Sequence, residues 1–136
     1  MSVSITGRLT TPTSTALRHG PSGALLETTA PKDNGGDGSR FSPTDLCAAS
    51  LAACVATTVS LYATRCGIPL TSIAFEIEKH MTTEPPRRIA RLVARYRVSS
   101  SCGDGDFEKL VNAGRTCPVR RSLHPDVLVE EVWERG

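Results

Sequence analysis

The sequence predicts a small α+β domain, and three patterns carry that prediction. Short stretches of alternating apolar and polar residues near both ends of the chain predict half-buried strands. One long segment without a charged residue, Leu46 to Thr64, predicts a helix that must be covered on all of its faces. Clusters of Gly, Pro, Asn and Asp between these segments predict loops. A chain of 136 residues has the usual size of one domain, so a single domain over residues 1–136 is expected.

Composition and charge narrow the class of protein. Hydrophobic residues make up 39% of the chain and charged residues 22%, values close to those of globular proteins, so disorder is not expected. The 16 basic and 14 acidic residues are spread without a block of one sign, which argues against nucleic-acid binding. The first residues, MSVSITGRLT, lack the features of a signal peptide, so we expect a cytoplasmic protein.

The first part of the chain predicts two strands and a loop. Val3, Ile5 and Leu9 alternate with polar residues and predict the first strand. Ala24 to Thr29 predicts a second strand after the turn-prone GPSG, and an antiparallel arrangement is expected. In APKDNGGDGSRFSP the turn-forming residues are so dense that a surface loop is predicted.

A long helix is predicted after this loop. Ser42 can cap the helix with its hydroxyl, Pro43 suits the first helical position, and Asp45 stands where the acid of a capping box belongs. The helix should run to about Cys66, because Gly67 can adopt the left-handed conformation that ends helices.

The uncharged middle of this helix indicates what must cover the helix in the folded protein. Its length approaches that of a membrane span, but it consists mostly of Ala, Ser, Thr and Cys without flanking Lys and Arg, so no membrane contact is expected. A helix of this kind in a soluble protein has to be covered on every side. One short chain covers a single side, so we expect a second copy of the helix across the two-fold axis of a homodimer. The alternative is a monomer whose sheet wraps the helix.

The rest of the chain predicts a hairpin, two helices and a closing strand. Leu70 to His80 and Ala90 to Val98 alternate as strands do and are joined by TTEPP, which predicts a hairpin. A helix is expected from about Asp104 to Gly114, followed by a shorter one directly after Cys117. The stretch Val127 to Trp133 is short and β-branched and predicts the last strand.

The five cysteines are the candidates for chemistry, because the thiolate is a nucleophile. Their odd number, the absence of CxxC and the lack of zinc-like Cys and His spacing argue against a disulfide framework and a metal site. Cys117 precedes Pro118, so its sulfur should lie at a helix N-terminus, where its pKa should fall or hydrogen bonds should hold it; the alternative is a weak cap in place of serine. Cys54 lies mid-helix, where a thiolate needs a nearby cation, and the alternative is inert packing. A structural role is expected for Cys47, Cys66 and Cys102.

Two segments resemble the signatures of the OsmC/Ohr family. SPTDLCAASLAACVATTVSLYATRCGIPL resembles the family's central helix, and the first redox cysteine of that pattern falls on Cys54. AGRTCPVRRSLHPDVLVE resembles the second signature, in which a Cys-Pro pair starts a helix, and its cysteine is Cys117. PPRRIARLVARYRV and GGDGSRFSPTDL resemble the family's strand after its β-turn and its glycine-rich entry into the helix. The order and spacing agree over nearly the whole chain.

This resemblance implies a fold and an activity. The implied fold has the two long central helices of an intertwined homodimer packed between antiparallel β-sheets. The implied activity is that of a thiol-dependent peroxidase in oxidative-stress defence, in which Cys54 attacks an organic hydroperoxide and becomes a sulfenic acid. Cys117 then condenses with it to a disulfide. A small dithiol or a thiol protein reduces the pair again, and no cofactor or metal is implied.

Peroxidase members of the family also place an arginine and a glutamate at this site. Arg18 is the best match for the arginine, with Arg40 as the second choice, and a guanidinium suits the role because it is always charged. The sequence departs from the pattern at the glutamate, where Thr44 stands and Asp45 is the nearest acid. The alternative function is therefore a non-catalytic dimeric stress protein that binds a small apolar ligand at the subunit interface.

Overall fold

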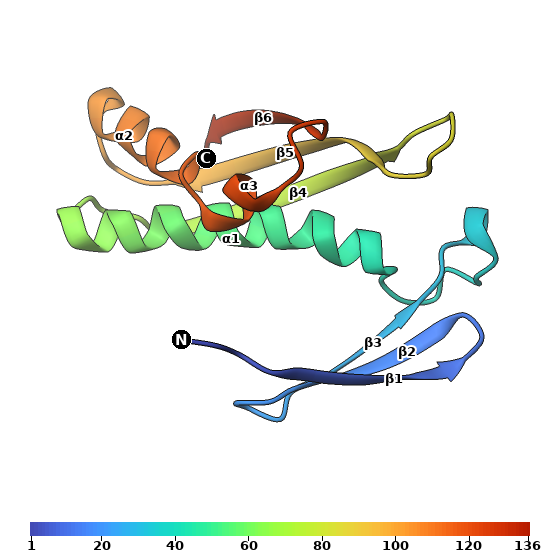
Figure 1. Ribbon diagram of the computed structural model, residues 1–136. Helices are drawn as coiled ribbons and strands as arrows, with labels where there is room; N and C mark the ends of the chain where they lie inside the picture. The colour runs from blue at the N-terminus through green and yellow to red at the C-terminus, as the bar shows by residue number, and fades with distance from the viewer. The chain divides into compact units, whose positions relative to one another are not determined.

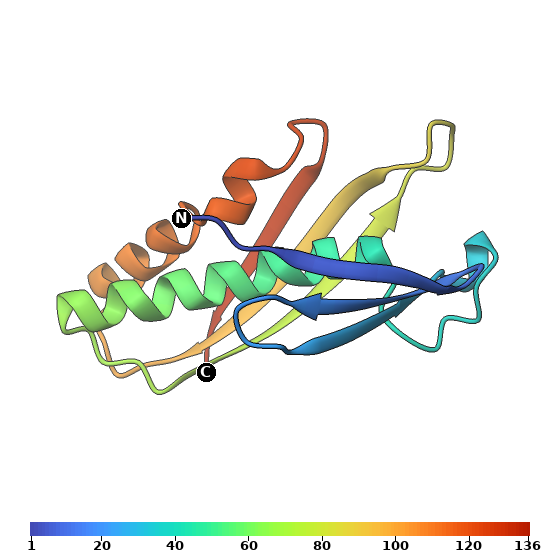
Figure 2. The same ribbon diagram turned by 60° about the horizontal axis from the view of Figure 1, so that its bottom comes forward.

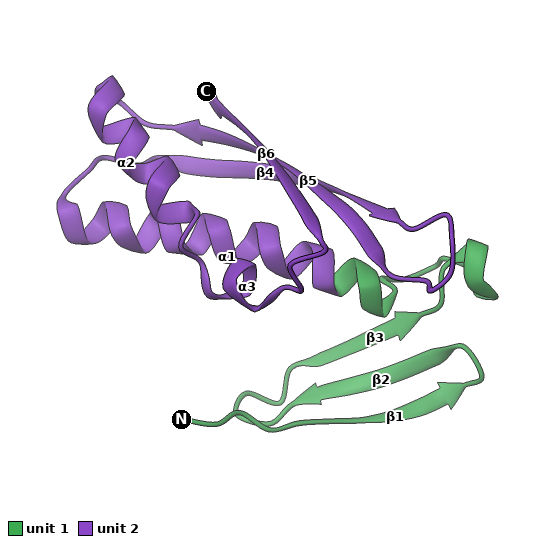
Figure 3. Cartoon of the chain, turned by 45° about the horizontal axis from the view of Figure 1, so that its top comes forward, with its two compact units in different colours: residues 1–46 green, residues 47–136 purple.

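The computed structural model describes all 136 residues. They form two compact units, residues 1–46 and residues 47–136 (Figure 3). Each unit contains one three-stranded β-sheet, and the helices complete the predicted α+β class. That the two units act as a single domain stays a prediction.

The first unit contains an antiparallel sheet of β1 (Ile5–Thr11), β2 (Ser14–His19) and β3 (Leu25–Thr29), in that order. The two strands predicted in this part of the chain correspond to β1 and β3. The central strand β2 is not predicted by the sequence. The loop after β3 holds one short 3-10 turn, η1 (Lys32–Asn34), and otherwise lacks regular structure, as its glycine-rich composition predicts.

Helix α1 (Pro43–Cys66) begins and ends where the sequence predicts. The Ser42 N–H donates to Asp45 Oδ2 at 2.9 Å, and the Asp45 N–H donates to Ser42 Oγ at 3.1 Å. This reciprocal pair is the predicted capping box, which satisfies N–H groups that the start of a helix leaves without partners. Gly67 has a φ of 65° and is the left-handed residue that ends the helix.

The second unit contains a mixed sheet with the order β4 (Ser72–Met81), β5 (Ile89–Ser99) and β6 (Leu128–Arg135). β4 and β5 form the predicted hairpin. β6 pairs in parallel with β5, because α2 (Asp104–Gly114) and α3 (Pro118–Ser122) carry the chain back before β6 begins. The expectation of antiparallel sheets therefore holds for the first sheet and for the β4–β5 pair, whereas the β5–β6 pair differs from it.

From Cys47 onward, α1 belongs to the second unit and lies along one face of this sheet (Figures 1 and 2). The buried α1 residues share one core with β5 and with Leu110 of α2. These α1 residues are Ala48, Leu51, Ala52, Val55, Val59 and Ala63. By length and composition α1 could also cross a membrane, but for one helix this is weak evidence, because the core helix of a soluble protein meets the same criteria.

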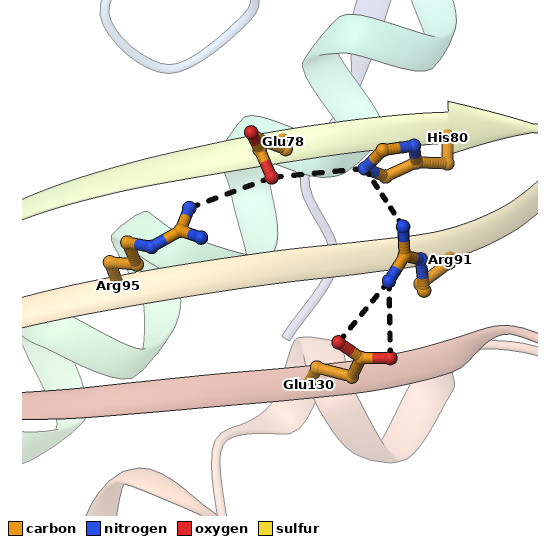
Figure 4. Close-up of polar contacts among 5 residues, drawn as sticks. All are labelled: Glu78, His80, Arg91, Arg95 and Glu130. Atoms are coloured by element: carbon orange, nitrogen blue, oxygen red, sulfur yellow. Dashed lines mark hydrogen bonds and ion pairs between the residues drawn. The ribbon is translucent and has the colours of Figure 1, made fainter.

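The two faces of the second sheet differ in kind. The inner face of β5 is apolar and joins the core with α1, and β6 places Glu131 and Trp133 opposite Ala94 and Tyr96 of that face. Successive residues of a strand point to opposite faces, so the neighbour Glu130 lies on the outer face. There it joins a network of polar side chains (Figure 4). The members of this network are Glu78, His80, Arg91, Arg95 and Glu130.

Candidate thiol site

The candidate site is built around Cys54 and Cys117, which both lie in the second unit. Cys54 is half-buried near the middle of α1, and Cys117 is the fully buried N-cap of α3. Although the two segments are far apart in the sequence, the Cys54 thiol lies close enough to Cys117 to raise the pKa of Cys117. The fold therefore brings together the two cysteines that the sequence singles out.

The first turn of α3 holds the sulfur of Cys117. The Arg120 N–H donates to Cys117 Sγ at 3.3 Å, which confirms the predicted capping position. The sequence predicts either a fall of the Cys117 pKa or hydrogen bonds that hold the sulfur. The hydrogen bond is present, whereas the fall of the pKa is wrong. Burial raises the pKa of Cys117, the Arg120 N–H opposes this rise, and the neighbouring Cys54 thiol adds to it. A helix of five residues has too small a dipole to offset the desolvation of a buried thiolate.

An aromatic pair lies beside the cysteines. Tyr96 of β5 stacks on Trp133 of β6 with 4.3 Å between the ring centroids. Burial raises the pKa of Tyr96, and the nearby Glu131 carboxylate and Cys117 raise it further, so the phenol stays protonated at neutral pH. Trp133 is the single tryptophan of the chain, so its fluorescence reports on the surroundings of the thiols.

A carboxylate on the inner face of the sheet completes the surroundings of Cys117. The Glu131 side chain is 12% exposed, and it accepts hydrogen bonds from Arg120 Nη1 at 3.1 Å and from Arg115 Nε. Both guanidinium groups offset a charge that would be costly to bury alone. Sequence reasoning missed this group. A signal for it exists in the sequence of the last strand. Glu131 lies two residues from both Val129 and Trp133, so it shares their core-facing side of the strand.

The arginines expected at the site lie in the first unit. Arg18 is an exposed residue of β2, paired with Thr6 of β1 and Leu25 of β3. Arg40 forms an exposed ion pair with Glu27, with 2.9 Å between Nη2 and Oε2. The role of either arginine beside the cysteines stays a prediction.

The residues around the expected glutamate position serve the start of α1. Thr44 Oγ1 lies 3.2 Å from Ser42 Oγ. Asp45 belongs to the capping box, which is the role that the sequence predicts for it. The structure therefore assigns Asp45 a helix-capping contact.

The other three cysteines differ from one another in how far they are buried. Cys102 is buried, Cys47 is half-buried and Cys66 is exposed in the last turn of α1. The Cys66 thiol hydrogen-bonds the Tyr62 phenol, which raises the pKa of Tyr62. No group of three or more His, Cys, Asp or Glu side chains is arranged to hold a metal ion. Two neighbouring thiols such as those of Cys54 and Cys117 can be oxidised to a disulfide and reduced again.

One protein-family model matches most of the chain. The family model described as OsmC-like protein matches residues 36–132, a segment that contains the capping box and both cysteines of the site. The chain belongs to the OsmC-like protein family. Comparison of this OsmC-like protein with curated proteins gives no match.

Solved structures with the same fold cover nearly the whole OsmC-like chain. A candidate osmotic stress induced and detoxification response protein of Psychrobacter arcticus 273-4 is 30% identical, with a TM-score of 0.87 over 98% of this chain and 96% of its own. The organic hydroperoxide resistance protein OsmC of Legionella pneumophila is 18% identical, with a TM-score of 0.76 over 98% and 97%. The organic hydroperoxide resistance protein OhrB of Bacillus subtilis is 16% identical, with a TM-score of 0.70 over 98% and 98%. The last two similarities establish a shared fold.

Proposed function

We propose that this OsmC-like protein is a thiol-dependent peroxidase that reduces organic hydroperoxides in oxidative-stress defence. The observation that carries the proposal is that Cys54 and Cys117 lie in one unit, where the Cys54 thiol is close enough to Cys117 to raise the pKa of Cys117. Two solved structures of the same fold are named organic hydroperoxide resistance proteins, which supports the substrate class.

The reaction balances with two thiols and one hydroperoxide. The Cys54 thiolate attacks the terminal oxygen of the hydroperoxide, the O–O bond breaks and the alcohol leaves, so Cys54 becomes a sulfenic acid. The Cys117 thiolate then attacks the Cys54 sulfur, the S–O bond breaks and water is released as the disulfide forms. Cys54 takes the first step because it is the more accessible of the two thiols, whereas Cys117 is fully buried.

A second thiol compound has to return the pair to its reduced form. We propose a small dithiol or a thiol protein as the reductant, acting by thiol–disulfide exchange. No cofactor takes part in this scheme, because the two cysteines carry both electrons. A cytoplasmic location suits it, since the glutathione and thioredoxin systems keep cytoplasmic thiols reduced.

Arg18 is proposed as the cation that favours the Cys54 thiolate and polarises the hydroperoxide. A guanidinium suits this role because it is always charged and presents several N–H donors. Arg40 is the second candidate, but its ion pair with Glu27 already engages its charge. Substitution of Arg18 by alanine should therefore slow the oxidation of Cys54 more than substitution of Arg40 does.

We also propose that the protein is a homodimer in which two copies of α1 meet. The exposed face of α1 carries no charge from Cys47 to Thr64, and Ser50, Thr57 and Thr64 each donate to a carbonyl of the preceding helical turn. These three hydroxyls therefore keep a hydrogen-bond partner when the face is covered. Leu61 on the same face is 52% exposed. Light scattering should give twice the chain mass of 14.5 kDa, and a monomer mass would contradict the proposal.

Thiol counting tests the peroxidase proposal directly. The reduced wild type, treated with an equimolar organic hydroperoxide, should lose two of its five thiols. Cys54→Ser should keep its remaining thiols, and Cys66→Ser is the matched control because it removes an exposed α1 cysteine outside the pair. A wild type that keeps all five thiols would refute the proposal.

A non-catalytic dimer that binds a small apolar ligand at the subunit interface is the second candidate function. Two observations favour it: Thr44 stands in place of the glutamate of the peroxidase pattern, and burial raises the pKa of Cys117 and so disfavours its thiolate. Ligand binding that is undiminished in Cys54→Ser, without consumption of hydroperoxide by the wild type, would support this function over the first.

A further inference from the structure

A single carboxylate holds both ends of the short segment that carries Cys117. Glu131 on β6 accepts a hydrogen bond from Arg120 Nη1 at 3.1 Å through one oxygen, and from Arg115 Nε through the other. Arg115 precedes Cys117 and Arg120 follows it. The backbone N–H of Arg120 in turn donates to Cys117 Sγ at 3.3 Å. The chain of contacts from Glu131 to the sulfur is therefore complete in the structure.

The segment depends on this carboxylate for its position. A helix of five residues, such as α3, has too few internal hydrogen bonds to be stable alone, so its place is set by tertiary contacts. The Glu131 side chain is 12% exposed, so solvent screens its charge-assisted hydrogen bonds far less than it screens those of an exposed ion pair. Glu131 of β6 links α3 to the sheet by such a bond with Arg120.

We propose that Glu131 is a positioning residue for Cys117. By holding Arg115 and Arg120, it keeps the Cys117 sulfur within reach of Cys54. This inference rests on the proposed peroxidase function and concerns its second step. In that step the Cys117 thiolate attacks the sulfur of the Cys54 sulfenic acid, the S–S bond forms and the S–O bond breaks. The leaving hydroxide takes up the proton that Cys117 released and becomes water. Both guanidinium groups stay paired with the Glu131 carboxylate, so the backbone N–H of Arg120 keeps its place at the Cys117 sulfur.

Substitution of Glu131 by glutamine tests the proposal, because it keeps the size of the side chain and removes its charge. After oxidation by one equivalent of an organic hydroperoxide, disulfide closure is followed by the fluorescence of Trp133, and the Cys54 sulfenic acid is trapped with dimedone. Closure should slow about tenfold in Glu131→Gln, with accumulation of trapped sulfenic acid. Closure at the wild-type rate would overturn the proposal.

Glu130→Gln is the matched control, because the same chemical change is made one residue away on the outer face of the sheet. It should close at the wild-type rate, and equal slowing in both variants would show that the effect is not specific to the inner carboxylate. Arg120→Gln should slow closure about as much as Glu131→Gln does. The double variant should be no slower than either single variant, since the two residues act as one unit. Slowing that multiplies in the double variant would show that Glu131 does not act through Arg120.

A second readout needs no hydroperoxide. The pH dependence of Cys117 alkylation, measured by peptide mass mapping, should move to higher pH in Glu131→Gln because the sulfur loses the fixed N–H donor of Arg120. Loss of a negative charge alone would favour the thiolate and move the profile to lower pH, so that result or an unchanged profile would overturn the proposal. Failure of the peroxidase proposal is distinct, because the wild type itself would then form no disulfide while the alkylation profile still decides the role of Glu131.

Discussion

The two faces of the second sheet hold their charges in different ways. On the outer face, Arg91 lies 3.4 Å from both Glu130 oxygens and 3.4 Å from His80 Nε2, and each of these side chains is at least 40% exposed (Figure 4). On the inner face, Glu131 is 12% exposed and is held by two arginines beside Cys117. Glu130 and Glu131 are neighbours in the sequence. Because successive residues of a strand point to opposite faces, Glu130 joins the solvated network and Glu131 contacts the candidate thiol site.

Exposure to solvent determines how much the ion pairs of each face contribute to stability. Exposed ion pairs such as those of the outer face contribute little to stability and are screened by salt. The nearly buried Glu131 is different, because water screens its charge-assisted hydrogen bonds less than it screens pairs in which both side chains are exposed. The inner face therefore holds both the buried core residues of the sheet and the candidate thiol site.

The largest expected difference between the faces concerns packing. Leu92 on the inner face is fully buried, so Leu92→Ala should lower the free energy of unfolding by about 2–5 kcal/mol. Val132 on the outer face is 41% exposed, so Val132→Ala should lower it by less than about 1 kcal/mol. Urea denaturation measures both values. Equal losses would contradict the assignment of the two faces.

Two glycines of α2 give a second comparison between a packed position and an open one. A Cβ on Gly114 would lie 3.0 Å from side-chain atoms of Trp133, Val55 and Val59, so Gly114→Ala should destabilise the protein by about 1–3 kcal/mol. Gly105 lies in the same helix, and a Cβ there meets nothing within 4 Å. Gly105→Ala should leave stability unchanged or raise it by up to about 1 kcal/mol. Thermal or urea unfolding that ranks the two variants in reverse order would refute this packing.

The buried thiol of Cys117 predicts that the stability of the protein depends on pH. Burial raises the pKa of Cys117, so the folded state favours the neutral thiol more than the unfolded chain does. This contribution is complete below the ordinary thiol pKa of about 8.5 and is lost as the pH rises through the higher pKa of the folded protein. The free energy of unfolding of the reduced wild type should therefore decline more steeply at alkaline pH than that of Cys117→Ser. Parallel curves would contradict the assigned burial.

The smallest effect is expected on the outer face. Glu130→Gln should change the free energy of unfolding by at most about 0.5 kcal/mol, and the change should vanish at about 1 M salt, where charges are screened within about 3 Å. Urea denaturation at low and high salt measures this difference. A large loss that persists at high salt would mean that the network in Figure 4 is more than a solvated surface.

The sequence predicts most of the fold because the signals are local. The capping box of Ser42 and Asp45, the left-handed Gly67 and the alternating strands are all readable from neighbouring residues. β2 escapes prediction because STALRH has no clear alternation of apolar and polar residues. The parallel direction of β6 also escapes it, since strand direction depends on how α2 and α3 return the chain.

The site is predicted less completely. The thiol pair is found from two sequence signatures, and its proximity follows from the packing of α3 near α1. The direction of the Cys117 pKa is missed, because burial depends on distant residues that no local motif reveals. Glu131 is missed for a different reason: its position in phase with Trp133 is a readable signal, but its partners come from other elements.

The central claim is that the thiols of Cys54 and Cys117 meet and join when a hydroperoxide oxidises the protein. Peptide mass mapping without reduction, after treatment with one equivalent of organic hydroperoxide, tests it most directly. The expected product is a single cross-link between the peptides that contain Cys54 and Cys117, removed by a dithiol. Recovery of both peptides with uncross-linked cysteines, or a cross-link through another cysteine in the wild type, would contradict the claim.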